Sequence, residues 1–150
     1  MYFGDLELKT EKSSHKFVNP MCWKSQNFPN YVTQELEKAN KVLLTGSRYI
    51  CKPPVMDTDI DILLLVDDLK DFDESLLRNG WVFLGKEYEG DHKSIYRKNE
   101  YNFIIVDSID LFTRWEFATF IGQELNLLEK IDRKNLFMLV EAYTKITYVP

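Results

Sequence analysis

The stretch TGSRYICKPPVMDTDIDILLLV, residues 45–66, decides which fold this chain can adopt. Its second half is an apolar run typical of a buried strand, and two carboxylates, Asp59 and Asp61, stand at the start of that run. A buried charge is costly unless it is paired or bound to a metal ion. Upstream, Gly46 and Ser47 follow a second apolar run. The two acids therefore need a partner, and the sequence raises the question of what that partner is.

The composition is that of an ordinary globular protein, with 45% hydrophobic and 29% charged residues in a chain of 150. We expect one domain over residues 1–150; residues 1–28 form an N-terminal arm without a clear pattern, which could hold a short helix or pack on the core. No apolar run reaches membrane-spanning length and the first residues lack a signal peptide, so we expect a cytoplasmic protein without a membrane partner. The net charge of −5 argues against broad binding to nucleic acid. Cys22 and Cys51 are expected to be reduced thiols.

The apolar pattern predicts an α+β fold, in which a mixed β-sheet is covered, mainly on one face, by helices. The predicted elements are a helix over 30–41, strands over 42–46 and 59–66, a helix over 67–80, a strand over 81–90, a hairpin over 95–107 and two C-terminal helices. Residues 48–58, with two prolines, are expected to be irregular. The first C-terminal helix is predicted from the spacing of Trp115, Ala118, Ile121, Leu125 and Leu128, with Phe112, Phe117 and Phe120 in the core. Asp132 is predicted to cap the second.

Alternate residues of a strand point to one face, so Asp59 and Asp61 are predicted to lie side by side. Mg²⁺, or Mn²⁺, suits such a pair, because it binds through one or two carboxylates and completes its shell with water and phosphate oxygens. The backbone N–H groups of the Gly46-Ser47 turn could hold a phosphate. The alternative is structural: solvated acids at a strand start, and a plain turn. Asp57 is read as a loop acid rather than a ligand, and His15 and His92 stand alone.

The glycine-serine pair, the loop and the sequence Asp-Ile-Asp-Ile resemble the signature of the polymerase-β-type nucleotidyltransferase superfamily, over roughly residues 30–107. A further resemblance, over residues 94–137, is to small phage-encoded proteins described as nucleotidyltransferases, which would place the chain in a host cytoplasm. The matching residues are Arg97, Asn102, Trp115, Ala118, Thr119, Leu125, Asn126, Leu127, Lys130, Asp132, Arg133, Leu136 and Phe137.

One position departs from the superfamily pattern. Active members usually carry a third carboxylate just before an aliphatic run on a neighbouring strand, and here that position is Asn102. An asparagine can hold a water or one metal contact but cannot act as a charged base. Asp107 stands at the far end of the same strand.

The resemblance implies a Mg²⁺-dependent enzyme that moves a nucleoside monophosphate from an NTP, with ATP expected, to an unknown acceptor. Its implied catalytic residues are Asp59, Asp61 and Asn102, with the two aspartates as metal ligands. Its implied nucleotide-binding residues are Gly46, Ser47, Arg48, Arg97, Lys130 and Arg133. Each of these cations could instead lie on a solvated surface. The acceptor could be a protein side chain, a small molecule or, least consistent with the acidic charge, an RNA end. The alternative function is a module that binds a nucleotide or a host protein without turnover.

Overall fold

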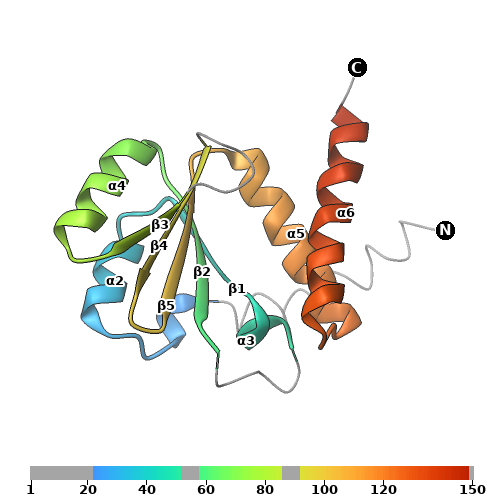
Figure 1. The fold of residues 1–150 in the computed structure, drawn as a ribbon, viewed down its shortest axis with the longest axis horizontal. Coiled ribbons are helices and arrows are strands. Elements are labelled where there is room, and N and C mark those ends of the chain that lie inside the picture. The colour runs from blue at the N-terminus through green and yellow to red at the C-terminus, as the bar shows by residue number, and fades with distance from the viewer. Residues whose placement is uncertain (1–21, 52–57, 86–91, 149–150) are drawn as a thin grey trace.

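The computed structural model describes residues 22–51, 58–85 and 92–148. They form a five-stranded mixed sheet in the order β1-β2-β5-β4-β3 (Figure 1). The strands are β1 Lys41–Thr45, β2 Ile60–Leu65, β3 Val82–Gly85, β4 Lys93–Lys98 and β5 Tyr101–Val106. The central pair, β2 and β5, is parallel, and the other pairs are antiparallel. The predicted mixed α+β architecture is confirmed.

Two helices cover one face of the sheet, α2 (Asn30–Leu36) and α4 (Leu69–Arg78). Even-numbered residues of β2 point toward them, so Ile62 and Leu64 are fully buried among side chains from both helices. On the same face, the rings of Trp81 and Phe103 stack with centroids 4.0 Å apart. This apolar layer is the larger of two cores that the sheet separates.

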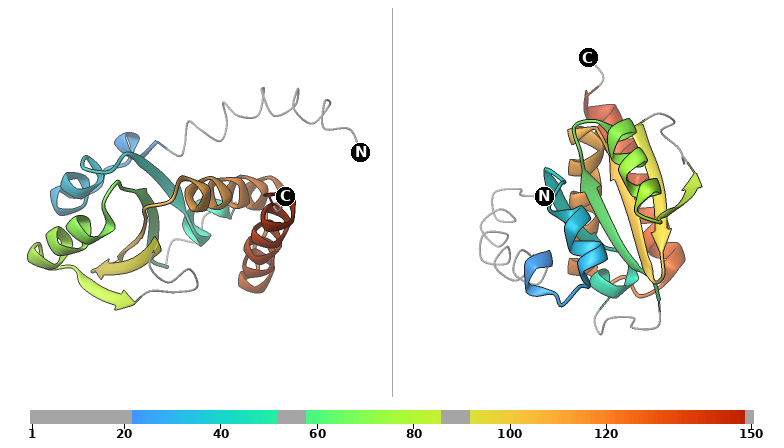
Figure 2. Two further views of the ribbon diagram at one scale, coloured as in Figure 1. Left: turned by 90° about the horizontal axis from the view of Figure 1, so that it is seen from above. Right: turned by 90° about the vertical axis from the view of Figure 1, so that its left-hand side faces the viewer.

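Helices α5 (Ile109–Leu125) and α6 (Lys130–Tyr148) lie on the opposite side (Figure 2). Helix α5 packs against β2 and β5, with Phe112 buried against Leu63 and Val106, while α6 packs on α5. The prediction that helices cover mainly one face is therefore wrong. Strand β2 is apolar at consecutive positions because both of its faces are covered, as is usual for a strand in a parallel pair.

Two boundaries in the first half of the chain differ from prediction. Helix α2 ends at Leu36 rather than residue 41, because the chain turns there and the Asn40 N–H donates to the Leu65 carbonyl of β2 at 2.8 Å. The segment predicted to be irregular begins with one helical turn, α3 (Ser47–Ile50). Proline restricts only itself and its preceding residue, so Pro53 leaves this turn unaffected. Strand β3 matches the start of the predicted strand over 81–90, whose last five residues lie outside the described ranges.

The C-terminal helices also differ in detail. Helix α5 ends at Leu125, where Asn126 adopts a left-handed conformation with φ 50°, so Leu128 lies beyond the helix. Asp132 falls in the first turn of α6 rather than at its cap, since α6 begins at Lys130. Phe117 was predicted to be in the core, but half of its surface is exposed. Across the described residues, no helix is both long and apolar enough to span a membrane.

Candidate active site

A line of polar residues crosses four strands at one end of the sheet. Asp61 on β2 pairs with Asn102 on β5, and Asn102 pairs with Arg97 on β4. On the other side of β2, Thr45 of β1 pairs with Asp61. Residues opposite one another in paired strands point to the same face. We call Thr45, Asp61, Asn102 and Arg97 the polar row. It lies where β2 and β5 begin and β1 and β4 end, at the lower end of the sheet in Figure 1.

Asp61 is held from two sides within this row. The Asn102 Nδ2 donates a hydrogen bond to Asp61 Oδ1 at 3.1 Å. The backbone of Gly46 packs against the same carboxylate, so closely that a Cβ atom on Gly46 would overlap its atoms. Gly46 also has φ +80°, a conformation that favours glycine. The fold therefore places the predicted glycine-serine turn directly against the predicted metal ligand.

Asp59 lies immediately before β2 and is paired with a cation. The Nη2 of Arg97 donates to Asp59 Oδ1 at 2.5 Å. Its Nε donates to the carbonyl of Asn99, in the turn between β4 and β5, at 3.2 Å. The two side chains are 44% and 38% exposed. The guanidinium is thus held at the tip of the hairpin and engages one of the two predicted metal ligands.

The charges around Asp61 interact. Burial raises the pKa of the Asp61 carboxyl, and the nearby charge of Asp59 raises that pKa further. The Asn102 hydrogen bond and the charges of Arg97 and Lys130 act in the opposite direction. Lys130, an exposed residue at the start of α6, is therefore close enough to influence the site. Burial also raises the pKa of Tyr49 to about 12, with Arg48 lowering and Asp61 raising it.

Two of the predicted nucleotide-binding residues, Arg48 and Arg133, bind backbone carbonyl groups of the protein near the site. The Nη2 of Arg48 donates to the carbonyl of Thr58 at 2.6 Å, and so fixes the residue before Asp59. Arg133 Nη1 contacts Cys51 Sγ at 3.2 Å and donates to the carbonyls of Leu127 and Leu128 at 3.0 and 2.7 Å. These contacts tie α6 to the end of α3 and to the connection after α5. Ser47, half-buried, begins α3 beside Gly46.

No supporting role was predicted for two buried polar residues of α5, Gln123 and Thr119, that hold the glycine-serine turn in place. The Gln123 Nε2 donates to the carbonyl of Tyr49, in α3, at 3.0 Å. The hydroxyls of Thr119 and Thr45 lie 2.7 Å apart. Both α5 residues lie on its sheet-facing side, four positions apart. A polar pair within an otherwise apolar helical stripe was the available signal.

The donor set fits one hard divalent cation. The carboxylates of Asp59 and Asp61 are close enough to interact, and Asn102 Oδ1 is a buried amide oxygen without a hydrogen-bond partner among the described residues. Such an oxygen can join two carboxylates in binding Mg²⁺ or Mn²⁺. In the described ranges, no three His, Cys, Asp or Glu side chains are grouped to bind a metal. Within the described part of the chain, the set therefore holds two carboxylates and not the three that would support a second metal.

Among the described residues, Asp107 does not complete the set. Asp107 follows the last residue of β5, five positions from Asn102, which is roughly 16 Å along a strand. There it pairs with His92, Nδ1 to Oδ1 at 3.0 Å, so His92 does have a partner in the fold. Asp57 lies outside the described residues.

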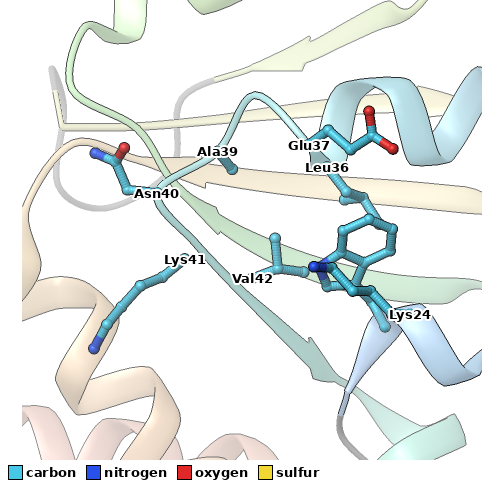
Figure 3. Close-up of a pocket in the computed structure, with 8 residues that line it drawn as sticks. Lys24, Leu36, Glu37, Ala39, Asn40, Lys41 and Val42 are labelled. Atoms are coloured by element: carbon cyan, nitrogen blue, oxygen red, sulfur yellow. The ribbon is translucent and has the colours of Figure 1, made fainter.

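A pocket at the other end of β1 is separate from the polar row. It is lined by residues of the first helical segments and of the β1 start: Trp23, Lys24, Leu36, Glu37, Ala39, Asn40, Lys41 and Val42 (Figure 3). Lys41 begins β1, whereas Gly46 follows its last residue. None of the predicted site residues lines this pocket.

Comparisons with known proteins assign no family to the chain, so a function has to be argued from the site. No protein-family model and no curated protein matches the chain. Among solved structures, the chain is similar to one described as the crystal structure of conserved protein GrpB from Enterococcus faecalis. The TM-score is 0.42 and the identity 16%, over 81% of this chain and 96% of that chain.

Proposed function

We propose that this protein is a Mg²⁺-dependent nucleotidyltransferase, which transfers a nucleoside monophosphate from an NTP to an acceptor. The single observation that carries the proposal is the contact of Gly46, at the start of α3, with Asp61 of the polar row. It joins a turn that suits phosphate to a carboxylate that suits a metal. The superfamily resemblance of residues 30–107 supports the same assignment.

Each residue of the site has a role in this proposal. Asp59, Asp61 and the Asn102 amide oxygen would hold the metal, which when bound supplies charge stabilisation at the phosphates. The backbone of Gly46 and Ser47 would contact the β- and γ-phosphates. In the reaction, an acceptor atom forms a bond to the α-phosphorus while the bond to the β-phosphate oxygen breaks and pyrophosphate leaves. Arg97 and Lys130 would offset the charge on that leaving group.

The test is pyrophosphate release from ATP with Mg²⁺ or Mn²⁺, with the other NTPs as comparison. We expect release in the wild type and its loss in Asp59→Asn and Asp61→Asn. Asp110→Asn is the matched control, because Asp110 is an exposed acid in the first turn of α5. Release that survives both site substitutions would contradict the proposal. Candidate acceptors for the assay are proteins, small molecules and RNA ends.

A second candidate function follows from Asn102. With an amide in place of the third carboxylate, the site could bind a metal-nucleotide complex without transferring it. Nucleotide binding that needs Asp61 but releases no pyrophosphate, with Mg²⁺ or Mn²⁺, would favour this binding module over the enzyme. Binding of neither metal nor nucleotide would exclude both functions and leave the acids as structural residues.

A further inference from the structure

The two carboxylates of the site differ in their direct contacts. Asp61 accepts from the neutral amide of Asn102, whereas Asp59 accepts from the guanidinium of Arg97. A cation at Asp59 would therefore lie next to a positive charge that already engages the same carboxylate. Two like charges at one carboxylate repel one another. Metal binding at Asp59 thus requires Arg97 to move or to acquire another anionic partner.

We propose that Arg97 exchanges between Asp59 and the phosphate chain of the nucleotide, and so makes metal binding at Asp59 depend on the nucleotide. The inference rests on the proposed function, because it takes an NTP as the anionic partner. It assigns Arg97 a coupling role, beyond offsetting charge on pyrophosphate.

The setting of the pair suits such an exchange. Arg97 and Asp59 are both well exposed, and an exposed ion pair contributes little to stability, so breaking it is inexpensive. Arg97 Nε donates a hydrogen bond to the backbone carbonyl of Asn99, in the same hairpin. This bond keeps the side chain near the site while its Nη atoms change partner. Guanidinium binds phosphate and carboxylate with the same fork of donors.

The charges favour binding of metal and nucleotide together. The two carboxylates and the guanidinium that contacts Asp59 together carry one net negative charge, which attracts a divalent cation only weakly. A triphosphate chain draws the guanidinium away and returns the full charge of Asp59 to the metal. The two ligands therefore bind with positive coupling, and that coupling is reciprocal.

The experiment measures Mn²⁺ affinity by calorimetry, with and without a non-hydrolysable ATP analogue. In the wild type, we expect the analogue to tighten Mn²⁺ binding. In Arg97→Gln, Mn²⁺ alone should bind roughly two- to fivefold more tightly, the range that corresponds to one exposed ion pair. The tightening by the analogue should shrink by a similar factor.

Two control variants also remove one positive charge, but at positions other than Arg97. Lys130→Gln removes a cation that influences Asp61, and Arg78→Gln removes an exposed cation at the end of α4. The coupling proposal is overturned if Arg97→Gln binds Mn²⁺ no more tightly than Lys130→Gln, or if the effect of the analogue is unchanged. Both outcomes leave Asp61-dependent Mn²⁺ binding, and hence the proposed function, in place. If the wild type binds no Mn²⁺, with or without the analogue, both the coupling proposal and the proposed function are contradicted.

Discussion

Asn102 and Asp61 face one another across the central parallel strands, with the Asn102 Nδ2 donating to Asp61 Oδ1 at 3.1 Å. The neutral amide of Asn102 leaves the charge of Asp61 unchanged, but it gives one carboxylate oxygen of Asp61 a hydrogen-bond donor in a partly buried position. It also directs its own Oδ1 toward a buried position without a hydrogen-bond partner in the described part of the chain. This pair sets how much negative charge lies at this end of β2 and β5.

Asn102→Asp should convert the pair into two carboxylates in contact. Without metal, we expect a loss of about 1–3 kcal/mol in the free energy of unfolding, because a hydrogen bond is replaced by like-charge repulsion. Mg²⁺ or Mn²⁺ should restore more stability to this variant than to the wild type. Thermal unfolding with and without metal checks both points. An equal metal response in the two proteins would refute a metal site at this pair.

Gly46→Ala should destabilise the protein through both strain and overlap. Gly46 has φ +80° and ψ −177°, a backbone region that is essentially restricted to glycine, so another residue there costs about 1–3 kcal/mol, and the added Cβ would collide with Asp61. Gly80→Ala is the control, because Gly80 has φ +87° but a Cβ there meets only the flexible end of Lys98 at ordinary distance. We expect a larger loss in Gly46→Ala by denaturant unfolding. Adding Asp61→Ala should recover part of the difference; equal losses in the two glycine variants would count against the contact.

Asp61→Asn should stabilise the apo protein at neutral pH. The folded state raises the pKa of Asp61 above its ordinary value of 3.8, so the folded protein binds this proton more tightly than the unfolded chain does. The stability that the folded protein gains by binding this proton is fully present below the pKa that Asp61 has in the unfolded chain. It is lost as the pH rises through the higher pKa that Asp61 has in the folded protein. The advantage of Asp61→Asn should therefore shrink as the pH falls toward 3.8. A gain that does not depend on pH would show a cause other than ionisation, and Asp110→Asn should give no gain.

Asn79→Ala should destabilise the layer of α2 and α4. The carboxylate of Glu35, fully buried, accepts from Asn79 Nδ2 at 2.6 Å and from Lys38 Nζ at 3.0 Å. Removing one donor from a buried acceptor costs about 1–3 kcal/mol. Chemical denaturation should show this loss, whereas Arg78→Ala, at the exposed neighbour, should stay within about 0.5 kcal/mol. In the Asn79→Ala background, Glu35→Leu should cost little further stability, since no buried charge is then left unpaired.

The fold was predictable where the signal is local. The run from Ile62 to Val66 is apolar at consecutive positions, which predicted a buried strand, and the hairpin over 95–107 followed from its turn at Asn99. The second helical layer was missed because α5 is apolar around much of its circumference and does not indicate which face of the sheet it covers. The end of α2 was missed because it depends on a bond from Asn40 to Leu65, distant in sequence.

The site was predictable in composition but not in its contacts. Asp59, Asp61 and Gly46 stand in one short stretch, so the sequence alone indicates them as candidate site residues. The pairing of Arg97 with Asp59 required the register of β4 and β5, which side-chain pattern alone does not define. The support of α3 by Gln123 spans 74 residues and depends on how α5 crosses the sheet. Long-range geometry of this kind has no counterpart in residue spacing.

The polar row also links ligand binding at the site to the cooperative opening of the sheet. Its members come from four strands, two of which form the central parallel pair, so the row cannot come apart while the sheet stays intact. The backbone amides of Asp61 and Asn102 should therefore exchange with solvent deuterium only through opening of the whole sheet. A ligand present at a hundred times its Kd would slow that exchange by an amount equivalent to about 2.7 kcal/mol. Protection at these two amides therefore provides a direct measure of ligand binding.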